Sequence, residues 1–297
     1  MILNASGCLD ALAAPEVARE LDAFVTKTVT PSPRGGNEPV RIAETDVGML
    51  NSIGLANPGI DRFCADLLPR LAELGVPLWV SVGGFNAEDY ADLCGVLDHY
   101  AEVSALELNL SCPNVASPAG GVAEIVSAAR AATAKPLYAK LAPSPDLREV
   151  SRAAAEAGAD GLSLVNTIRG LALDERTLAP VLSTASGGLS GPALRPVALA
   201  AVFTCFRETG LPIVGMGGVE TGRHALELTA AGAAAVALGT VLFADPHAPA
   251  RVRAELAAES AARGFGSVED VVGAAHDGTV ARRDDTRHKN VVLAGKN

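Results

Sequence analysis

The stretch LYAKLAPSPDLREVSRAAAEAGADGLSLV, residues 137–165, shows the pattern that decides the fold of this chain. It opens with a short apolar run, continues as a helical pattern over residues 146–157, stops at Gly158 and returns to an apolar run at residues 161–165. Glycine just past a helix tolerates the left-handed backbone that ends many helices. Two apolar runs joined by such a helix predict parallel strands whose outer face the helix covers.

The same unit recurs on both sides of this stretch. Apolar runs bounded by Gly, Pro or charged residues alternate with helical patterns, and eight runs can be counted. Eight strand–helix units close most simply into a single-domain (β/α)8 barrel, the TIM barrel, for which 297 residues is an ordinary length. The predicted strands are residues 2–5, 23–28, 78–82, 105–110, 137–141, 161–165, 213–216 and 235–238. The predicted helices are residues 15–21, 60–74, 87–100, 121–132, 146–157, 192–208 and 222–231.

Two longer segments interrupt this alternation, residues 29–59 and 166–191. Both are rich in Gly, Pro, Asn, Ser and Thr, and each follows a predicted strand, where the active sites of barrels are assembled. We therefore expect two long active-site loops at the C-terminal face. The barrel domain is expected to span residues 1–265, and residues 266–297 are expected to form a polar C-terminal tail.

Composition narrows the class of protein. A hydrophobic fraction of 49% beside a charged fraction of 20% indicates a large buried core. No run approaches the roughly 18 consecutive apolar residues of a membrane span, and the start of the chain has no basic signal region, so we expect a cytoplasmic protein with no membrane partner. The formal net charge of −10 disfavours nucleic acid as a partner.

The cysteines predict free thiols in a reducing compartment. They are odd in number, scattered and without a C-x-x-C pair, so they offer no ligand set for zinc or an iron–sulfur cluster, and no metal site is expected. Any iron–sulfur centre in a downstream electron transfer would then belong to another chain. The five are Cys8, Cys64, Cys94, Cys112 and Cys205.

Polar residues and glycines stand where the predicted strands end. A single lysine at such a place is usually a surface residue whose stem covers apolar neighbours. Two lysines and two asparagines on four different strands favour a functional site instead, because the carboxyl ends of barrel strands meet at one mouth. The strand-end residues are Ser6, Lys27, Ser81, Asn109, Lys140, Asn166, Gly217 and Gly239.

Glycine motifs follow the seventh and eighth strands, Gly215-Met216-Gly217-Gly218-Val219 and Gly239-Thr240. Where side chains are missing, backbone N–H groups can approach an anion, and barrels commonly bind a phosphate at this place. Either motif alone would indicate only a tight turn. Together they predict a phosphorylated ligand.

The segment Asn109-Leu110-Ser111-Cys112-Pro113-Asn114 has the most specific chemistry. It places a thiol between two amides, each of which presents a donor and an acceptor to a planar polar substrate. A cysteine with a stabilised thiolate titrates close enough to neutral pH to act as a base. Cys112 is therefore the candidate catalytic base, and the other cysteines are interpreted as core or strand-end residues.

This set of motifs resembles the class 1 dihydroorotate dehydrogenases. The resemblance covers residues 2–265, and Arg34-Gly35-Gly36-Asn37 and Met49-Leu50-Asn51 are most similar to the catalytic subunit of the class 1B, NAD-linked type. Besides the segment around Cys112, the motifs are Ser6-Gly7-Cys8, Lys27-Thr28, Gly48-Met49-Leu50-Asn51-Ser52-Ile53-Gly54-Leu55, Asn166-Thr167, Gly187-Gly188-Leu189-Ser190-Gly191 and Gly215-Met216-Gly217-Gly218.

The resemblance implies FMN at the barrel mouth, dihydroorotate beside it and Cys112 as the catalytic base. Ser81 stands where the family pattern has an asparagine on the flavin, and the loop after Asn114 is shorter than in that pattern. The implied FMN-binding residues are Ser6, Lys27, Thr28, Asn109, Lys140, Val165, Gly191, Gly217, Gly218, Gly239 and Thr240. The implied substrate-binding residues are Lys27, Asn51, Ser52, Ile53, Gly54, Leu55, Asn109, Asn114, Asn166 and Thr167.

The implied reaction is the oxidation of (S)-dihydroorotate to orotate in pyrimidine biosynthesis, leading to UMP. Cys112 would take a proton from C5 while hydride passes from C6 to the flavin. Two electron acceptors remain open: fumarate, with a homodimer, or NAD⁺ through a heterotetramer with a subunit that carries FAD and an iron–sulfur cluster. The class 1B resemblance favours the second.

Two other readings of the same residues compete. An FMN barrel could act on another pyrimidine, such as a dihydropyrimidine or the dihydrouridine of tRNA. The acidic balance argues against tRNA, and the two lysines fit a substrate carboxylate. A phosphate-binding barrel without catalysis is disfavoured, because it has no need for Cys112 between two asparagines.

Overall fold

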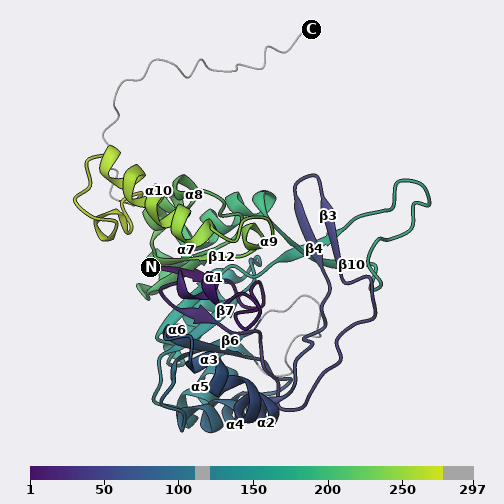
Figure 1. Ribbon diagram of the computed structural model, residues 1–297. Coiled ribbons are helices and arrows are strands. Elements are labelled where there is room, and N and C mark those ends of the chain that lie inside the picture. Colours follow the sequence, from purple (N-terminus) through teal and green to yellow (C-terminus); the bar gives the residue numbers. More distant parts are fainter. Residues whose placement is uncertain (111–120, 277–297) are drawn as a thin grey trace.

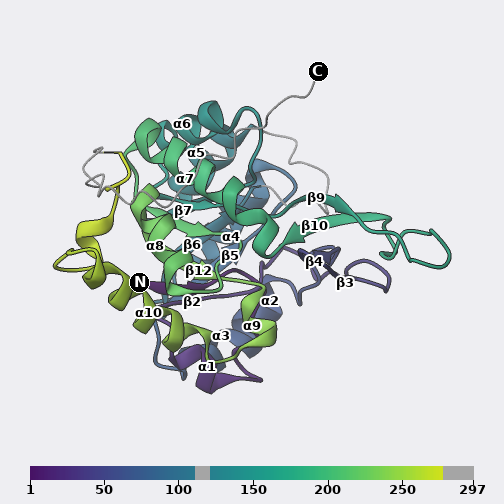
Figure 2. The ribbon, with the colours of Figure 1, turned by 90° about the horizontal axis from the view of Figure 1, so that it is seen from above.

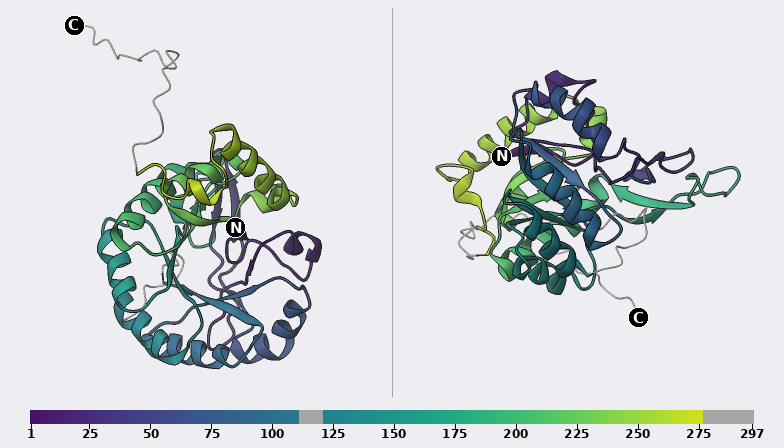
Figure 3. Two further views of the ribbon diagram at one scale, coloured as in Figure 1. Left: turned by 90° about the vertical axis from the view of Figure 1, so that its left-hand side faces the viewer. Right: turned by 90° about the horizontal axis from the view of Figure 1, so that it is seen from below.

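The computed structural model describes residues 1–110 and 121–276 of the chain. Eight parallel strands lie in the order β1-β12-β11-β8-β7-β6-β5-β2, and a parallel bridge between Leu3 and Ala23 joins the two ends of that order. The sheet therefore closes into the predicted (β/α)8 barrel, with the helices as a ring around it (Figure 3, left). The strands are β1 Ile2–Asn4, β2 Phe24–Val25, β5 Leu78–Val82, β6 Val103–Asn109, β7 Leu137–Leu141, β8 Gly161–Leu164, β11 Ile213–Met216 and β12 Ala233–Leu238.

The side chain of Asn4 strengthens the seam between β1 and β2. Its Nδ2 donates to the carbonyl of Val25 at 2.8 Å, and its Oδ1 accepts from the amide of Val25 at 2.8 Å. Asn4 is fully buried, and its amide takes the place of a backbone peptide in the ladder. This explains why a polar residue sits in an otherwise apolar strand.

The helices follow the predicted order. The helix expected at residues 60–74 is interrupted by a π-helical turn, and two helices after β12 were not predicted. None of the helices within the described ranges has the length and apolar character of a membrane span. The helices are α1 Pro15–Arg19, α2 Ile60–Arg62, the π turn Phe63–Leu67, α3 Leu68–Ala72, α4 Ala87–Asp98, α5 Val122–Ala132, α6 Leu147–Glu156, α7 Arg195–Thr209, α8 Gly222–Ala231, α9 Val241–Ala244 and α10 Ala248–Ala262, with 3₁₀ turns at Pro192–Leu194 and Glu269–Val271.

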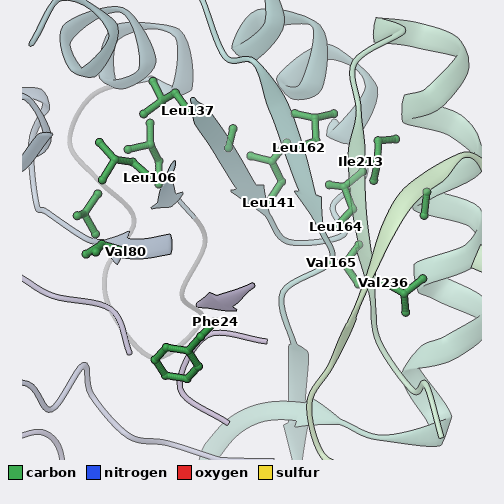
Figure 4. Packing of buried hydrophobic residues seen from close by; sticks show 14 of the residues in the cluster. Phe24, Val80, Leu106, Leu137, Leu141, Leu162, Leu164, Val165, Ile213 and Val236 are labelled. Atoms are coloured by element: carbon green, nitrogen blue, oxygen red, sulfur yellow. The ribbon is translucent and has the colours of Figure 1, made fainter. Parts of the chain in front are cut away.

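The core has two layers. The larger layer lies between the strands and the helices, where buried leucines, isoleucines and valines of neighbouring strands pack (Figure 4). The second layer fills the barrel interior and includes Trp79 packed on Tyr138, with ring centroids 4.5 Å apart and the ring planes tilted by 37°. Gly161 leaves room for this pair, because a Cβ there would lie 2.3 Å from the Tyr138 ring. The interior below the barrel mouth is thus packed with side chains.

The two segments expected to be loops pair into a second sheet. Its four antiparallel strands have the order β3-β4-β10-β9, with β3 Ile42–Thr45, β4 Gly48–Asn51, β9 Ile168–Leu171 and β10 Ser186–Ser190. This sheet extends away from the barrel at the right of Figures 1 and 2. The expectation of loops was wrong for these strands, whose backbone pairing joins segments more than 130 residues apart, such as Gly188 with Asn51.

The C-terminal end of the described chain packs on α8. The amide of Gly273 donates to the carbonyl of Thr229, and the amide of Ala275 donates to that of Ala230. The ring of His276 stacks on Phe203 with centroids 3.9 Å apart. Residues 269–276 therefore add to the outer layer of the barrel, although they fall within the segment expected to be a tail.

Candidate active site

One cavity opens at the carboxyl ends of the barrel strands, under the four-stranded sheet. Residues at the end of every barrel strand except β5 line it among the described residues, together with residues of β3 and β4. All of the strand-end residues named from the sequence line it except Ser81. Ser81 is fully buried, and its hydroxyl lies 3.0 Å from that of Thr28, so it supports a lining residue from behind.

A chain of hydrogen bonds orients the polar side chains of the cavity. The hydroxyl of Thr28 accepts from Asn109 Nδ2 at 3.1 Å and lies 3.4 Å from that of Ser6. Asn109 Oδ1 in turn accepts from Asn166 Nδ2 at 3.2 Å. These contacts connect strands β1, β2, β6 and β8 and fix which way both amides point. The cavity therefore presents a fixed array of donors and acceptors.

Lys140 lies on the floor of the cavity in an ion pair. Its Nζ is 3.3 Å from Oε1 of Glu107, and the side chains of Lys140 and Glu107 are 7% and 2% exposed. Glu107 does not line the cavity. Sequence reasoning missed Glu107, although a carboxylate between Leu106 and Leu108 of a predicted parallel strand is an unusual enough residue to be noticed.

Lys27 contributes a second ammonium group, and Gly7 makes room for its stem. Gly7 has a φ of +80°, and a Cβ there would lie 2.8 Å from Cδ of Lys27. The adjacent Cys8 also lines the cavity, and burial raises the pKa of its thiol although Lys140 and Lys27 oppose the shift. Cys8 is thus held as a neutral thiol beside two cations.

Three of the glycines predicted to approach a phosphate line the cavity just after the neighbouring strands β11 and β12. Gly217 and Gly218 have φ values of +128° and +69°, and a Cβ on Gly218 would lie 2.8 Å from the carbonyl oxygen of Gly191. At Gly239 the space is wider, with Ala5 Cβ at 3.5 Å. The hydroxyl of Thr240 donates to that of Ser190 at 2.9 Å, which joins the loop after β12 to β10. These positions expose backbone to the cavity without side chains.

The four-stranded sheet supplies the opposite wall. Ile42 and Met49 line the cavity, and neither was predicted to do so. Asn51 also lines it, and its Nδ2 donates to the carbonyl of Gly188 at 3.3 Å. Ser52 does not line it: its hydroxyl is buried and accepts from Asn37 Nδ2 at 2.7 Å and from Thr184 Oγ1 at 2.6 Å. Ser52 therefore holds this wall together.

The structure brings nearly all of the predicted site residues that it describes to this single cavity. Cys112 and Asn114 lie outside the described residues, and Ser52 and Ser81 are the described residues that are not part of the lining. Lining residues that sequence reasoning missed include Ile42, Met49, Glu220 and Phe243. The predicted residues found on the lining are Ser6, Lys27, Thr28, Asn51, Ile53, Gly54, Leu55, Asn109, Lys140, Val165, Asn166, Thr167, Gly191, Gly217, Gly218, Gly239 and Thr240.

Comparison with known proteins agrees with this geometry. The family model described as "Dihydroorotate dehydrogenase" matches residues 1–259. A protein of Desulforudis audaxviator named "Dihydroorotate dehydrogenase B (NAD(+)), catalytic subunit" is 46% identical over 266 residues, with 86% of each chain covered. A protein of Solibacter usitatus, provisionally named as dihydroorotate dehydrogenase A (fumarate), is 42% identical, with 85% of this chain and 86% of its own length covered.

A solved structure shares the fold. The crystal structure of DHODH from Eimeria tenella in complex with ferulenol superposes with a TM-score of 0.75 at 25% identity, covering 93% of this chain and 85% of that one. Three findings therefore agree on the family: the family model matches most of the chain, relatives are more than 40% identical, and a solved structure shares the barrel. The chain belongs to the dihydroorotate dehydrogenase family, whose members are flavin-dependent oxidoreductases.

Proposed function

We propose that this protein oxidises (S)-dihydroorotate to orotate in pyrimidine biosynthesis, with FMN as its flavin and Cys112 as general base. The family supports the reaction. The observation that carries the proposal is the convergence of the linked amides of Asn109 and Asn166 with the ammonium groups of Lys27 and Lys140 on one cavity. A planar ring with carbonyl and N–H edges and a carboxylate is the kind of molecule that such groups recognise.

The chemistry of the cavity lining supports FMN as the flavin. The exposed backbone at Gly217, Gly218 and Gly239 suits a phosphate that side chains would exclude, and the ammonium of Lys140 suits the negative charge of a reduced flavin. When bound, FMN would supply the acceptor for the hydride leaving C6 of the substrate. The residues proposed to hold it are Ser6, Lys27, Thr28, Asn109, Lys140, Val165, Gly191, Gly217, Gly218, Gly239 and Thr240.

The chain's own residues bind and orient dihydroorotate. We assign the substrate carboxylate to Lys27, because a lysine is a compact point charge whose stem Gly7 accommodates. The amide of Asn109 is oriented in advance by Thr28, and that of Asn166 by Asn109, so little ordering of either amide is needed when the ring binds. The other residues proposed to contact the substrate are Asn51, Ile53, Gly54, Leu55, Asn114 and Thr167.

Cys112 would accept the proton from C5. We expect Cys112→Ala to slow anaerobic reduction of the flavin by dihydroorotate at least about a hundredfold, the usual range for loss of a general base, while FMN stays bound. Cys8→Ser is the matched control, because Cys8 lies in the same cavity and burial raises its pKa. Stopped-flow absorbance of the flavin measures both rates. Wild-type reduction by Cys112→Ala, or a loss confined to Cys8→Ser, would overturn the assignment of the base.

The substrate class is tested with the same assay. Dihydroorotate should bleach the flavin, whereas dihydrouracil and dihydrouridine-containing tRNA should not. In Lys27→Met the preference for dihydroorotate over dihydrouracil should fall at least tenfold, because the cation assigned to the carboxylate is gone. Rapid bleaching by dihydrouracil in the parent protein would support the other pyrimidine reaction instead. A purified protein without a flavin spectrum would contradict both the proposed reaction with dihydroorotate and the reaction with another pyrimidine.

For the electron acceptor we propose NAD⁺, reached through a partner subunit with FAD and an iron–sulfur cluster. The relative named as a catalytic subunit supports a partner, while the relative named for fumarate keeps a homodimer as the alternative. Reoxidation of the reduced flavin should be slow with NAD⁺ or fumarate alone and fast with NAD⁺ once the partner is added. Fast reoxidation by fumarate in the isolated protein would favour the homodimeric type.

A further inference from the structure

We infer that Glu107 is a positioning residue that lowers the reduction potential of the bound flavin by opposing the charge of Lys140 from beneath the cavity. The inference rests on the proposed binding of FMN. Glu107 is 1% exposed and sits in β6 between Leu106 and Leu108, which both belong to the outer core layer. Because side chains alternate along a strand, Glu107 shares the inner face with Ala105 and Asn109.

The ion pair connects the cavity with the barrel interior. Lys140 lines the cavity floor, and Glu107 holds its Nζ at 3.3 Å from a position that does not line the cavity. In the sheet register Glu107 lies next to Tyr138, whose ring packs against Trp79 in the apolar layer. The carboxylate therefore sits at the boundary between the polar mouth and the packed interior, where little water screens its charge.

The cost of burying this pair points to a role beyond stability. Taking two charged groups out of water is seldom repaid in full by their attraction, and apolar side chains of similar volume often stabilise a core as well or better. The polar surroundings are also incomplete, because the hydroxyl of Ser163, opposite Lys140 in the register, is buried without a hydrogen-bond partner among the described residues. Close packing alone does not account for this arrangement.

The pair has a direct electrostatic consequence for a flavin above it. A reduced flavin carries more negative charge than an oxidised one, so the ammonium of Lys140 favours reduction. The carboxylate of Glu107 cancels part of that effect and also keeps the ammonium at the floor of the cavity. Glu107 should thus bring the potential below the value that Lys140 alone would produce.

The test is the midpoint potential of the FMN-loaded protein, measured by spectroelectrochemistry without dihydroorotate. Glu107→Gln keeps the shape and removes the charge, and it should raise the equilibrium constant for two-electron reduction at least tenfold, about 30 mV. Glu107→Asp keeps the charge and should shift the potential by less than half as much. Glu102→Gln makes the same change at an exposed position just before β6 and should leave the potential unaltered.

A second pair of variants keeps the inference testable if Glu107→Gln does not fold. Lys140→Met should lower the potential, and the double variant Glu107→Gln/Lys140→Met, which buries no charge, should lie between the parent and Lys140→Met. An unchanged or lower potential in folded Glu107→Gln, an equal shift in Glu107→Asp, or a double variant at or below Lys140→Met would each overturn the role of Glu107. Failure of the proposed reaction would appear separately, as missing FMN or as no bleaching of the parent by dihydroorotate.

Discussion

The two sheets of this molecule are built from strands of similar length by different rules. The barrel strands β5 and β8 are buried at every residue, because the packed interior covers one face and helices cover the other. In the small sheet, β3 alternates between exposed and half-buried residues. The sheet also keeps exposed apolar side chains, such as Ile42 in β3 and Leu171 in β9. The barrel stabilises the fold, and the small sheet covers one wall of the cavity.

Because the two sheets differ in burial, their contributions to stability and to ligand binding can be measured separately. A strand packed on both faces loses many contacts when one side chain is shortened. A strand that is open on one face loses few. Matched substitutions in the two sheets should therefore have large effects on unfolding in one and small effects in the other, while both sheets affect the cavity.

The largest difference is expected for apolar truncations. Leu108→Ala in β6 removes a fully buried side chain and should lower the free energy of unfolding by about 2–5 kcal/mol. Ile42→Ala in β3 removes a side chain that is 45% exposed and should cost less than about 0.5 kcal/mol. Because Ile42 lines the cavity, the second variant should instead raise the KM for dihydroorotate. Urea unfolding and steady-state kinetics measure the two quantities, and equal losses of stability would contradict the comparison.

A smaller difference is expected at glycines. Gly218→Ala puts a Cβ 2.8 Å from the backbone oxygen of Gly191 at a φ of +69°, so strain and a shifted backbone should weaken FMN binding about tenfold or more. Gly170→Ala, in β9, meets Cδ2 of Leu50 at 2.8 Å and Cβ of Leu189 at 3.2 Å, so its strain falls on side chains of the small sheet and not on the glycine motif. Fluorescence titration of the apoprotein with FMN should show weaker FMN binding for Gly218→Ala and parent-like binding for Gly170→Ala. Comparable affinities in the two variants would contradict the phosphate role of the glycine motif.

The smallest difference concerns two aspartates that accept hydrogen bonds from threonines. Asp98 Oδ1 accepts from Thr133 Oγ1 at 2.5 Å and thereby connects α4 to the segment after α5. Asp174 Oδ1 accepts from Thr177 Oγ1 at 2.9 Å within one turn between β9 and β10. The Thr133 hydroxyl lowers the pKa of Asp98, and the Thr177 amide, followed by the Thr177 hydroxyl, lowers the pKa of Asp174. Each contribution to stability is therefore present above the unfolded-state pKa and is lost as the pH falls through the folded-state value.

The pH dependence should therefore separate the two aspartates. Asp98→Asn should lower the Tm at neutral pH and reduce the loss of Tm on acidification, because Asp98 connects α4 to the segment after α5 in the barrel wall. Asp174→Asn should change the Tm and its acid dependence much less, because its hydrogen bonds stabilise only a local turn. Thermal melts between about pH 3 and pH 7 measure this. An Asp174→Asn variant with the larger acid effect would show that the small sheet contributes to global unfolding.

The same contrast explains which elements could be predicted. The runs at residues 137–141 and 161–165 are recognisable because burial on both faces demands continuous apolar sequence, and helix stops such as Gly158 and Gly232 mark the units. The strands of the small sheet contain Gly-Met-Leu-Asn and Ser-Gly-Gly-Leu-Ser, in which no apolar alternation is visible. Their pairing depends on a partner far away in the chain, which local patterns do not report.

The cavity shows the same division at the level of single residues. Lys27, Asn109, Lys140 and Asn166 could be assigned to one mouth because strand ends of a parallel barrel converge by geometry. Ser52 and Ser81 have equally suggestive positions in the sequence, yet both hydroxyls are used inside the protein. Which of two neighbouring polar residues reaches a cavity depends on the local turn of the chain.

By itself, the sequence determined the barrel, its strand order along the chain and the residue types at its mouth, because hydrophobic periodicity and glycine stops act locally. Only the tertiary structure decided that residues 42–51 and 168–190 share a sheet, that Asn4 forms part of the barrel seam, and that Glu107 holds Lys140. These features arise from contacts between segments distant in sequence. Their free energy depends on burial and distance, and neither quantity exists until the chain has folded.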